Sequence, residues 1–320
     1  MKILFKLSVL FLSLANALSI NAQEWPSRPI KMVVPFAPAG STDILGRMVA
    51  QKLSDALGQS VIVENRPGAA GNLGTDIVSK SLPDGYTILL AGGSNAVNAN
   101  LYKSLPFDFT RDLSGIALIG ISPNVMVVPQ SLAVSSAGEF IDYAKKNKGT
   151  INYASSGNGA TTHLSAELFK SVMGVEMTHV PFNGSNPALL ALLSGQVHVM
   201  FDSVISATPL IKAGKLKALG VTSPNRIASL PDTPTLKEVG VNVEAISFFG
   251  IYAPSKTPPS IIARYSSELR KIMKLSDVSL KLSELGVQPI DLTPIEFQSF
   301  TSKQIEGWAL PVRLSGARID

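Results

Sequence analysis

The feature that most constrains the fold is the alternation of short β-branched segments with helical segments from Ile30 onward. The segment "IKMVVPFA" precedes a helical pattern over 44–57 that ends at Gly58, and "SVIVEN" precedes another over 72–81. The same alternation restarts at Val134 and continues to "LKALGVTS". Strands that alternate with helices form parallel sheets that are covered by helices on both faces. The sequence therefore predicts two α/β lobes in tandem.

Two hydrophobic runs exceed the usual strand length of about five or six residues. They are Leu113–Pro129 and Val243–Pro254. We interpret both as segments that pass from one lobe to the other, with breaks near 122–124 and 247–250. Two crossings form a hinge with a cleft between the lobes, a geometry that closes around ligands.

These crossings define the expected domains. Domain 1 combines residues 23–123 with 247–320, and domain 2 is 124–246. After the second crossing the sequence indicates only helices, one over 259–285 and one that begins at Thr293-Pro294-Ile295-Glu296. That tetrad has Pro at the first helical position and a capping-box Thr and Glu, which together indicate a helix start.

The first 22 residues have the order of a signal peptide. Lys2 and Lys6 precede an apolar run over 7–18, and Ile20-Asn21-Ala22 provides a small-residue cleavage site. A run of about 12 apolar residues is shorter than the roughly 20 that a membrane anchor needs. We therefore expect export to the periplasm, with cleavage after Ala22.

Composition excludes several classes of function. Without residues 1–22 the formal charge falls from +5 to +3, and the basic residues are scattered, so we expect no nucleic-acid partner. There is no cysteine, which excludes disulfides, thiolate metal sites and a cysteine nucleophile. The three histidines, His163, His179 and His198, have no metal-ligand spacing. We expect no metal and no cofactor.

Five loops that follow predicted strands are rich in Gly, Ser, Thr and Asn and contain no Lys or Arg. They span 36–43, 91–96, 155–163, 182–187 and 201–203. In parallel sheets the ligand lies outside the carboxyl ends of the strands, where helix N-termini offer unpaired N–H groups. We expect these loops to bind a carboxylate-like group through N–H groups, hydroxyls and water. Candidate contacts include Phe36, Ser94, Asn95 and Asn183.

Structural interpretations of individual residues remain open. Gly and Ser after a strand are also ordinary turn residues. His163 fits a packed or capping histidine as well as a ligand contact, and Asp43 could serve only the helix dipole. Phe248 and Phe249 either belong to the core or line the cleft mouth, and Asp202 either reaches the cleft or stays behind it.

A hydrolase is the chief enzyme alternative. The segment "GGSNA", with Ser94 after a strand, comes within one residue of a nucleophile elbow. The acid and the histidine that should follow it have no evident pairing. The segment "GNGATT" lacks the third glycine of a dinucleotide fingerprint, and there is no Walker A motif.

The loops, in this order, resemble those of the substrate-binding proteins of tripartite tricarboxylate transporters, the Bug receptors. The resemblance covers nearly the whole mature chain, through "WPSRPIKMVVPFAPAGSTDILGR", "VENRPGAAGNLGTDIVSKSLPDGYTILL", "INYASSGNGATTHLSAELFK", "HVPFNGSNPALLALLSGQVHVMFDS", "GKLKALGVTS" and "GIYAPSKTPPSII". It implies a two-lobed periplasmic-binding-protein fold, similar to type II, that encloses one carboxylated metabolite.

The resemblance also implies residue roles. Two loops would clamp a carboxyl group, partly through ordered water, and an acidic position would lie near the distal end of the ligand. The matching residues are Ala39, Gly40, Ser41, Thr42 and Asp43 on one side, Ser156, Gly157, Gly159, Thr161 and His163 on the other, and Asp202 at the distal end. The family turn reads Pro-Gly-Gly, whereas this chain has Pro38-Ala39-Gly40.

We therefore predict a monomeric periplasmic receptor that binds a small carboxylate and delivers it to membrane permease subunits. No catalytic residue is expected. The alternatives are a periplasmic serine hydrolase using Ser94 and an orphan receptor that senses a carboxylate without transporting it.

Overall fold

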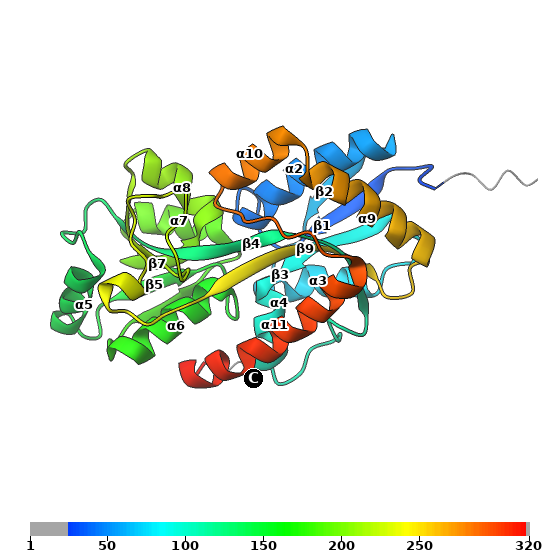
Figure 1. Ribbon diagram of the computed structural model, residues 1–320. Coiled ribbons are helices and arrows are strands. Elements are labelled where there is room, and N and C mark those ends of the chain that lie inside the picture. The colour runs from blue at the N-terminus through cyan, green and yellow to red at the C-terminus, as the bar shows by residue number, and fades with distance from the viewer. Residues whose placement is uncertain (1–24, 318–320) are drawn as a thin grey trace, which may run out of the picture.

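The computed structural model describes residues 25–317, so the expected cleavage after Ala22 lies outside the described residues (Figure 1). Within this range no helix is long and apolar enough to cross a membrane. The elements are β1 (Ile30–Val34), α2 (Ser41–Leu57), β2 (Val61–Asn65), η1 (Ala69–Gly71), α3 (Asn72–Ser79), β3 (Thr87–Gly92), α4 (Gly93–Leu101), β4 (Leu113–Pro129), α5 (Ala137–Lys146), β5 (Asn152–Ser155), α6 (Thr161–Met173), β6 (Thr178–Pro181), α7 (Ser185–Leu193), β7 (Val199–Ser203), α8 (Val204–Lys212), β8 (Leu216–Val221), η2 (Lys237–Val239), β9 (Ile246–Pro254), α9 (Pro259–Met273), α10 (Ser276–Glu284) and α11 (Pro294–Ser315).

The chain folds into two α/β lobes, as the alternating pattern predicts. In lobe 1, β1 pairs in parallel with β2 and β3, and β9 lies antiparallel between β3 and the first part of β4. In lobe 2, β5 pairs in parallel with β6 and β7, while β7 and β8 lie antiparallel to the second part of β4. Figure 1 shows the lobes side by side, with β4 and β9 running between them.

The crossings differ from the expected breaks near 122–124 and 247–250. Strand β4 pairs with β9 up to Pro123 and with β7 from Asn124, without interruption. Strand β9 is also continuous and begins at Ile246, just after Ala245, whose N–H still bonds Thr222 in lobe 2. The chain stays extended at both places because the two strands pair with each other there. The hinge therefore consists of paired strands, and the domain boundaries themselves stay a prediction.

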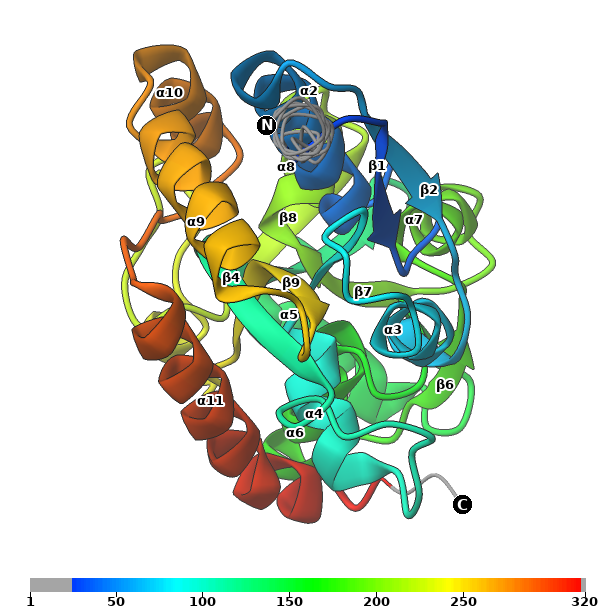
Figure 2. The same cartoon turned by 90° about the vertical axis from the view of Figure 1, so that its right-hand side faces the viewer.

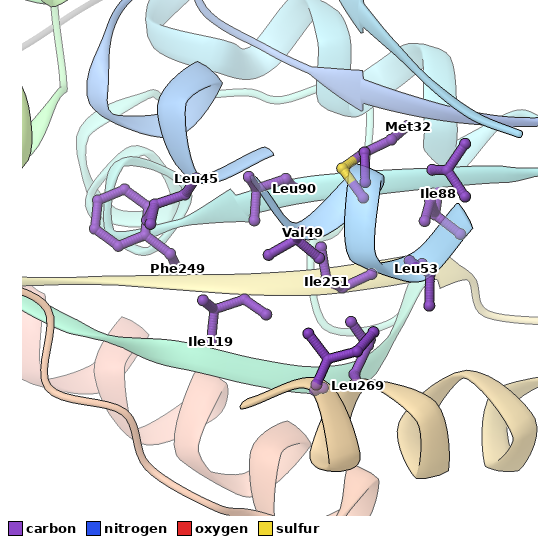
Figure 3. Close-up of a cluster of buried hydrophobic side chains, with 14 of the residues drawn as sticks. Met32, Leu45, Val49, Leu53, Ile88, Leu90, Ile119, Phe249, Ile251 and Leu269 are labelled. Carbon is purple, nitrogen blue, oxygen red and sulfur yellow. The ribbon is translucent and has the colours of Figure 1, made fainter. Parts of the chain in front are cut away.

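The core of lobe 1 lies between its sheet and the helices α2 and α9 (Figure 3). Met32, Leu90 and Ile251 of the sheet belong to one buried cluster with Leu45 of α2 and Leu269 of α9. Because helices cover both faces, the strands read as continuous apolar runs. This packing holds the first residues of α2 against the ends of β1 and β3.

Lobe 2 is likewise covered on both faces of its sheet. On β4, Met126 packs with Phe140 of α5 and Phe169 of α6, while Val127 on the opposite face packs with Leu192 of α7. Successive side chains of a strand point to opposite faces, so a strand buried on both sides is apolar throughout. The buried sheet fixes where α6, α7 and α8 begin.

The C-terminal helices correct one prediction and confirm another. The expected helix over 259–285 is two helices, α9 and α10, because the chain is extended at Leu275 and restarts with Asp277 in the first turn of α10. Thr293 and Glu296 do form the capping box that begins α11. Helix α11 packs against α4 of lobe 1 and α6 of lobe 2, and Figure 2 shows it along one side of the molecule.

Candidate ligand-binding site

The candidate site is a small cavity between the lobes, with a volume of about 30 Å³. Both lobes contribute to its wall, and nine of the residues bear hydroxyl groups. The lining residues are Phe36, Gly40, Ser41, Thr42, Ser94, Ser247 and Phe249 from lobe 1, and Ser156, Thr161, Thr162, Ser185 and Ser203 from lobe 2. No lining residue bears a charge, so the polarity of the cavity comes from hydroxyls and backbone groups.

Five helices begin at this cavity. The lining residues Ser41, Ser94, Thr161 and Ser185 lie in the first turns of α2, α4, α6 and α7, and Ser203 is the N-cap residue of α8. The first N–H groups of a helix have no partner within the helix, and each N-terminus has the effect of about half a positive charge. At none of these five N-caps does a side chain accept a hydrogen bond from the helix. The cavity is therefore electropositive without a cationic side chain.

The turn before α2 is organised by Asp43, which does not line the cavity. Its carboxylate accepts hydrogen bonds from the backbone N–H of Ala39 (2.9 Å), from Arg47 (2.9 Å) and from Asn65 (2.8 Å). Burial alone would raise the pKa of the Asp43 carboxyl, but these hydrogen bonds together outweigh burial and lower the pKa. Asp43 stays ionised, holds the turn, and directs Ser41 and Thr42 into the cavity.

Ala39, where the family turn has glycine, adopts a φ of 61°. A left-handed backbone costs a residue with a Cβ roughly 1 kcal/mol. We therefore expect Ala39→Gly to raise the free energy of unfolding by about 0.5–1 kcal/mol, measured by urea denaturation. Ala263→Gly, at an exposed position of α9, is the control and should lower the free energy of unfolding by about 1 kcal/mol. A loss of stability in Ala39→Gly would contradict strain at this turn.

The opposing loop, residues 155–162, runs from the last residue of β5 to the first turn of α6. Ser156 lies with Thr162 at the cavity: the Thr162 hydroxyl oxygen accepts the Ser156 N–H at 2.9 Å, and their two hydroxyls also lie 2.9 Å apart. The predicted ligand residue His163 faces away, with its ring stacked on His179 at a centroid distance of 4.1 Å. Gly159 donates its N–H to His163 Nδ1 at 3.2 Å. Thus the loop presents hydroxyls to the cavity while the imidazole supports it from behind.

Asp202 lies behind the wall of the cavity. Its side chain is fully buried, one carboxylate oxygen accepts a hydrogen bond from Ser206 at 2.6 Å, and the other has no partner among the described residues. Burial raises the pKa of Asp202 to about 6, although the hydrogen bond from Ser206 opposes this shift. Asp202 is therefore held by Ser206 of α8 and supports the wall from behind without lining the cavity.

The lobes touch each other around the cavity. The N–H of Ala37 in lobe 1 donates to the carbonyl oxygen of Asn183 in lobe 2 at 3.1 Å, and the Tyr102 hydroxyl donates to the carbonyl oxygen of Asn158 at 3.2 Å. Gly159 approaches α4 so closely that a Cβ on it would lie 2.0 Å from Asn98 Oδ1. The lobes are therefore closed, and the closed cavity has room for only about two water molecules.

The structure brings together part of the predicted set. Phe36, Gly40, Ser41, Thr42, Ser94, Ser156 and Thr161 line the cavity. Ala39, Asp43, Asn95, Gly157, Gly159, His163, Asn183, Asp202 and Phe248 do not line it. Of these, Asn95 bonds Thr75 and the N–H of Gly92, and Phe248 packs edge-on against Phe300.

Five lining residues are missing from the predicted site set: Thr162, Ser185, Ser203, Ser247 and Phe249, of which the sequence analysis considered only Phe249 for the cleft mouth. The first three occur in the Gly/Ser/Thr loops that the sequence singled out, so their loops could be predicted although their orientations could not. For the last two the signal is strand alternation. Because β9 is extended, Ser247 and Phe249 share one face and Phe248 takes the other.

The fold has two α/β lobes and a cavity between them. The cavity has no charged side chain in its wall and is electropositive because helix N-termini surround it. These features define a solute-binding protein. The family described as "Tripartite tricarboxylate transporter family receptor" matches residues 45–312. Protein BugT of Bordetella pertussis (strain Tohama I) is 35% identical over 306 residues, which cover 95% of this chain and 94% of BugT. The chain therefore belongs to the tripartite tricarboxylate transporter receptor family.

Two solved structures of similar proteins contain carboxylates. The structure of R. palustris Rpa4515 with adipate has a TM-score of 0.90 at 35% identity and covers 92% of this chain and 100% of its own. MatC (Rpa3494) from Rhodopseudomonas palustris with bound malate has a TM-score of 0.86 at 30% identity and covers 90% of this chain and 100% of its own. The family and these similar structures are substrate-binding receptors, so the protein is a receptor and not an enzyme.

Proposed function

We propose that this protein binds a small carboxylate metabolite in the interlobe cavity and delivers it to the permease subunits of a tripartite tricarboxylate-type transporter. The observation that supports this most strongly is the convergence of five helix N-termini on one uncharged cavity. Such termini bind anions through N–H groups and dipoles. The carboxylates in the structures of Rpa4515 and MatC support the same ligand class.

Binding in this proposal requires the lobes to separate and close again. A closed cavity of about 30 Å³ is too small for a metabolite of several carbon atoms, so the ligand enters an open form and the walls adjust around it. The paired strands β4 and β9 provide the connection about which the lobes move. Because contacts are made from both sides, the ligand favours the closed form over the open form.

The proposed permease partner and the proposed cellular location are inferred from membership of the family. Receptors of this family are periplasmic, and we propose that this chain is exported, cleaved after Ala22 and active as a monomer in the periplasm. Intact mass of the exported protein checks the cleavage. A mature species that retains residues 1–22 would contradict it.

A thermal-shift screen against dicarboxylates, tricarboxylates, aromatic acids and acidic amino acids tests the ligand class. A ligand at about 100 times its Kd should add about 2.7 kcal/mol to the free energy of unfolding. Adipate and malate are the first probes because they occur in the two similar structures. If no carboxylate stabilises the protein and a neutral solute does, the proposed ligand class is wrong.

Thr42→Val should weaken binding of the ligand from this screen by roughly tenfold to a hundredfold. Hydrogen bonds to charged groups contribute about 1.5–3 kcal/mol, and valine keeps the shape of threonine while it removes the hydroxyl. Thr208→Val is the matched control, since the Thr208 hydroxyl is buried, has no partner among the described residues and lies outside the wall. Calorimetry measures both variants, and unchanged affinity in Thr42→Val would remove this hydroxyl from the site.

A further inference from the structure

We propose that His163 and His179 form a neutral stacked pair that positions the ligand-binding loop 155–162 and that neither imidazole contacts the ligand. This inference rests on the proposed function, because it assigns the support of one wall of the same cavity. It gives His179 a role in binding and moves His163 from ligand contact to positioning residue.

The two imidazoles come from different elements and meet behind the loop. His163 lies in the first turn of α6 and His179 on β6, and their rings are 4.1 Å apart between centroids, with planes 11° from parallel. Tyr153 of β5 continues the stack on His179 at 4.8 Å and 13°. Three neighbouring elements are thus joined through one column of rings at the base of the loop.

Both imidazoles also hydrogen-bond the loop. His163 Nδ1 accepts the N–H of Gly159 at 3.2 Å, and His179 Nε2 lies 2.6 Å from the Ser155 hydroxyl oxygen. The same Ser155 oxygen accepts the N–H of Gly157 at 3.2 Å. The backbone is therefore fixed at both glycines, which are the points where it is freest to move. Ser156 lines the cavity and lies between Ser155 and Gly157, which are joined by their own hydrogen bond, so its orientation depends on the pair.

The geometry requires His163 to be neutral, because a protonated Nδ1 cannot accept the N–H of Gly159. Burial lowers the pKa of His163 to about 4, and the charge of Lys170 adds to this shift. Burial, His163 and Lys170 also lower the pKa of His179 to about 3, although Glu167 opposes them. The other titratable groups that face the pair are Tyr153 and Glu167, which bond each other, and Lys170, which bonds Glu167.

The lowered pKa values of the two histidines determine how the stability of the fold depends on pH. Both pKa values lie below 6.5, the ordinary value for histidine, so the unfolded chain binds more protons than the folded protein as the pH falls below 6.5. Above about pH 6.5 the two histidines do not change the free energy of unfolding, and this free energy falls as the pH drops from 6.5 toward 4 for His163 and toward 3 for His179. At neutral pH the loop is held by two uncharged rings.

The test uses paired substitutions in the full mature chain. His163→Phe and His179→Phe keep an aromatic ring in the stack and remove its nitrogen atoms, whereas His163→Asn and His179→Gln restore a polar atom near Nδ1 and Nε2. His198→Phe is the matched control. His198 Nδ1 accepts the N–H of Asn152 at 3.0 Å, at the opposite end of β5 from the loop.

The first readout is amide hydrogen exchange of residues 155–162, which requires no ligand. Both Phe variants should speed exchange by about two- to tenfold, the effect of losing one hydrogen bond of roughly 0.5–1.5 kcal/mol. The Asn and Gln variants and His198→Phe should stay within about twofold of wild type. Unchanged exchange in both Phe variants, or no recovery in the Asn and Gln variants, overturns the positioning role.

The second readout is an NMR titration of the imidazoles. Both should remain neutral at pH 6, and either ring titrating above pH 6 overturns the neutral pair. The third is affinity for the ligand from the screen: a loss in His163→Phe without faster exchange would mean direct contact and would also overturn the proposal. If wild type binds no carboxylate, the proposed function fails, while exchange and titration still decide the role of the pair.

Discussion

Gly159→Ala is expected to hold the lobes apart and to lower ligand affinity by about a hundredfold. Gly159 belongs to lobe 2, and a Cβ on it would lie 2.0 Å from Asn98 Oδ1 and 3.0 Å from Leu101 Cδ2 on α4 of lobe 1. Asn98 cannot simply turn aside, because its Nδ2 donates to Asn72 Oδ1 (2.8 Å) and to the carbonyl oxygen of Ala70 (3.2 Å). Apparent affinity falls with the population of the competent state, so a closed population of about 1% costs a hundredfold.

Small-angle scattering and calorimetry check this expectation. The variant should keep a larger radius of gyration than wild type at saturating ligand. Gly149→Ala is the matched control in lobe 2: it places alanine at a similar positive φ of 76°, where an added Cβ meets nothing within 4 Å. Adding Asn98→Ala to Gly159→Ala should restore closure, since it removes the obstructing oxygen. A Gly159→Ala protein that closes and binds like wild type would show that this contact does not limit closure.

The fold could be predicted because its strands are buried on both faces. A run such as "IKMVV" followed by a helical pattern leaves few arrangements other than a parallel sheet covered by helices. The change of partner in β4 falls within the predicted 122–124, but the unbroken strand there could not be predicted, since it depends on the tertiary pairing of β4 with β9 and β7. The split between α9 and α10 was missed for a similar reason, because the apolar pattern continues through Leu275.

The site was predictable at the level of loops and less so at the level of side chains. The Gly, Ser, Thr and Asn content of the strand-end loops identified them in the sequence. Ser41 and Thr161 reach the cavity because they lie at the uncapped N-termini of α2 and α6. Orientation was harder, because polar residues also organise turns: Asp43 bonds Ala39 and Arg47 in place of a ligand. His163 is the same case, with its ring turned to His179. A sequence pattern can thus indicate which loop binds the ligand, but it does not distinguish residues that line the cavity from residues that support the loop.

Ser94→Asp is the second substitution with a large expected effect, and it should act in opposite directions on stability and on binding. Ser94 lies in the first turn of α4 and in the wall of the cavity. A carboxylate in the first turn interacts favourably with the helix dipole, by about 0.3–1 kcal/mol, so the fold should not lose stability. The same carboxylate would stand beside the bound anion. Two like charges about 4 Å apart repel by about 4 kcal/mol at an effective dielectric constant of 20.

Affinity for the carboxylate should therefore fall by about a thousandfold in Ser94→Asp. Ser94→Asn is the matched control, since it has nearly the same shape without the charge, and it should lose much less. Calorimetry at pH 7 gives the affinities, and urea denaturation shows whether Ser94→Asp remains as stable as wild type. Because the Asp and Asn side chains fill the same space, the difference between the two affinities reports the effect of the charge alone. If Asp and Asn weaken binding equally, volume and not the electropositive field of the helix N-termini controls the site, and the dipole account of anion binding fails.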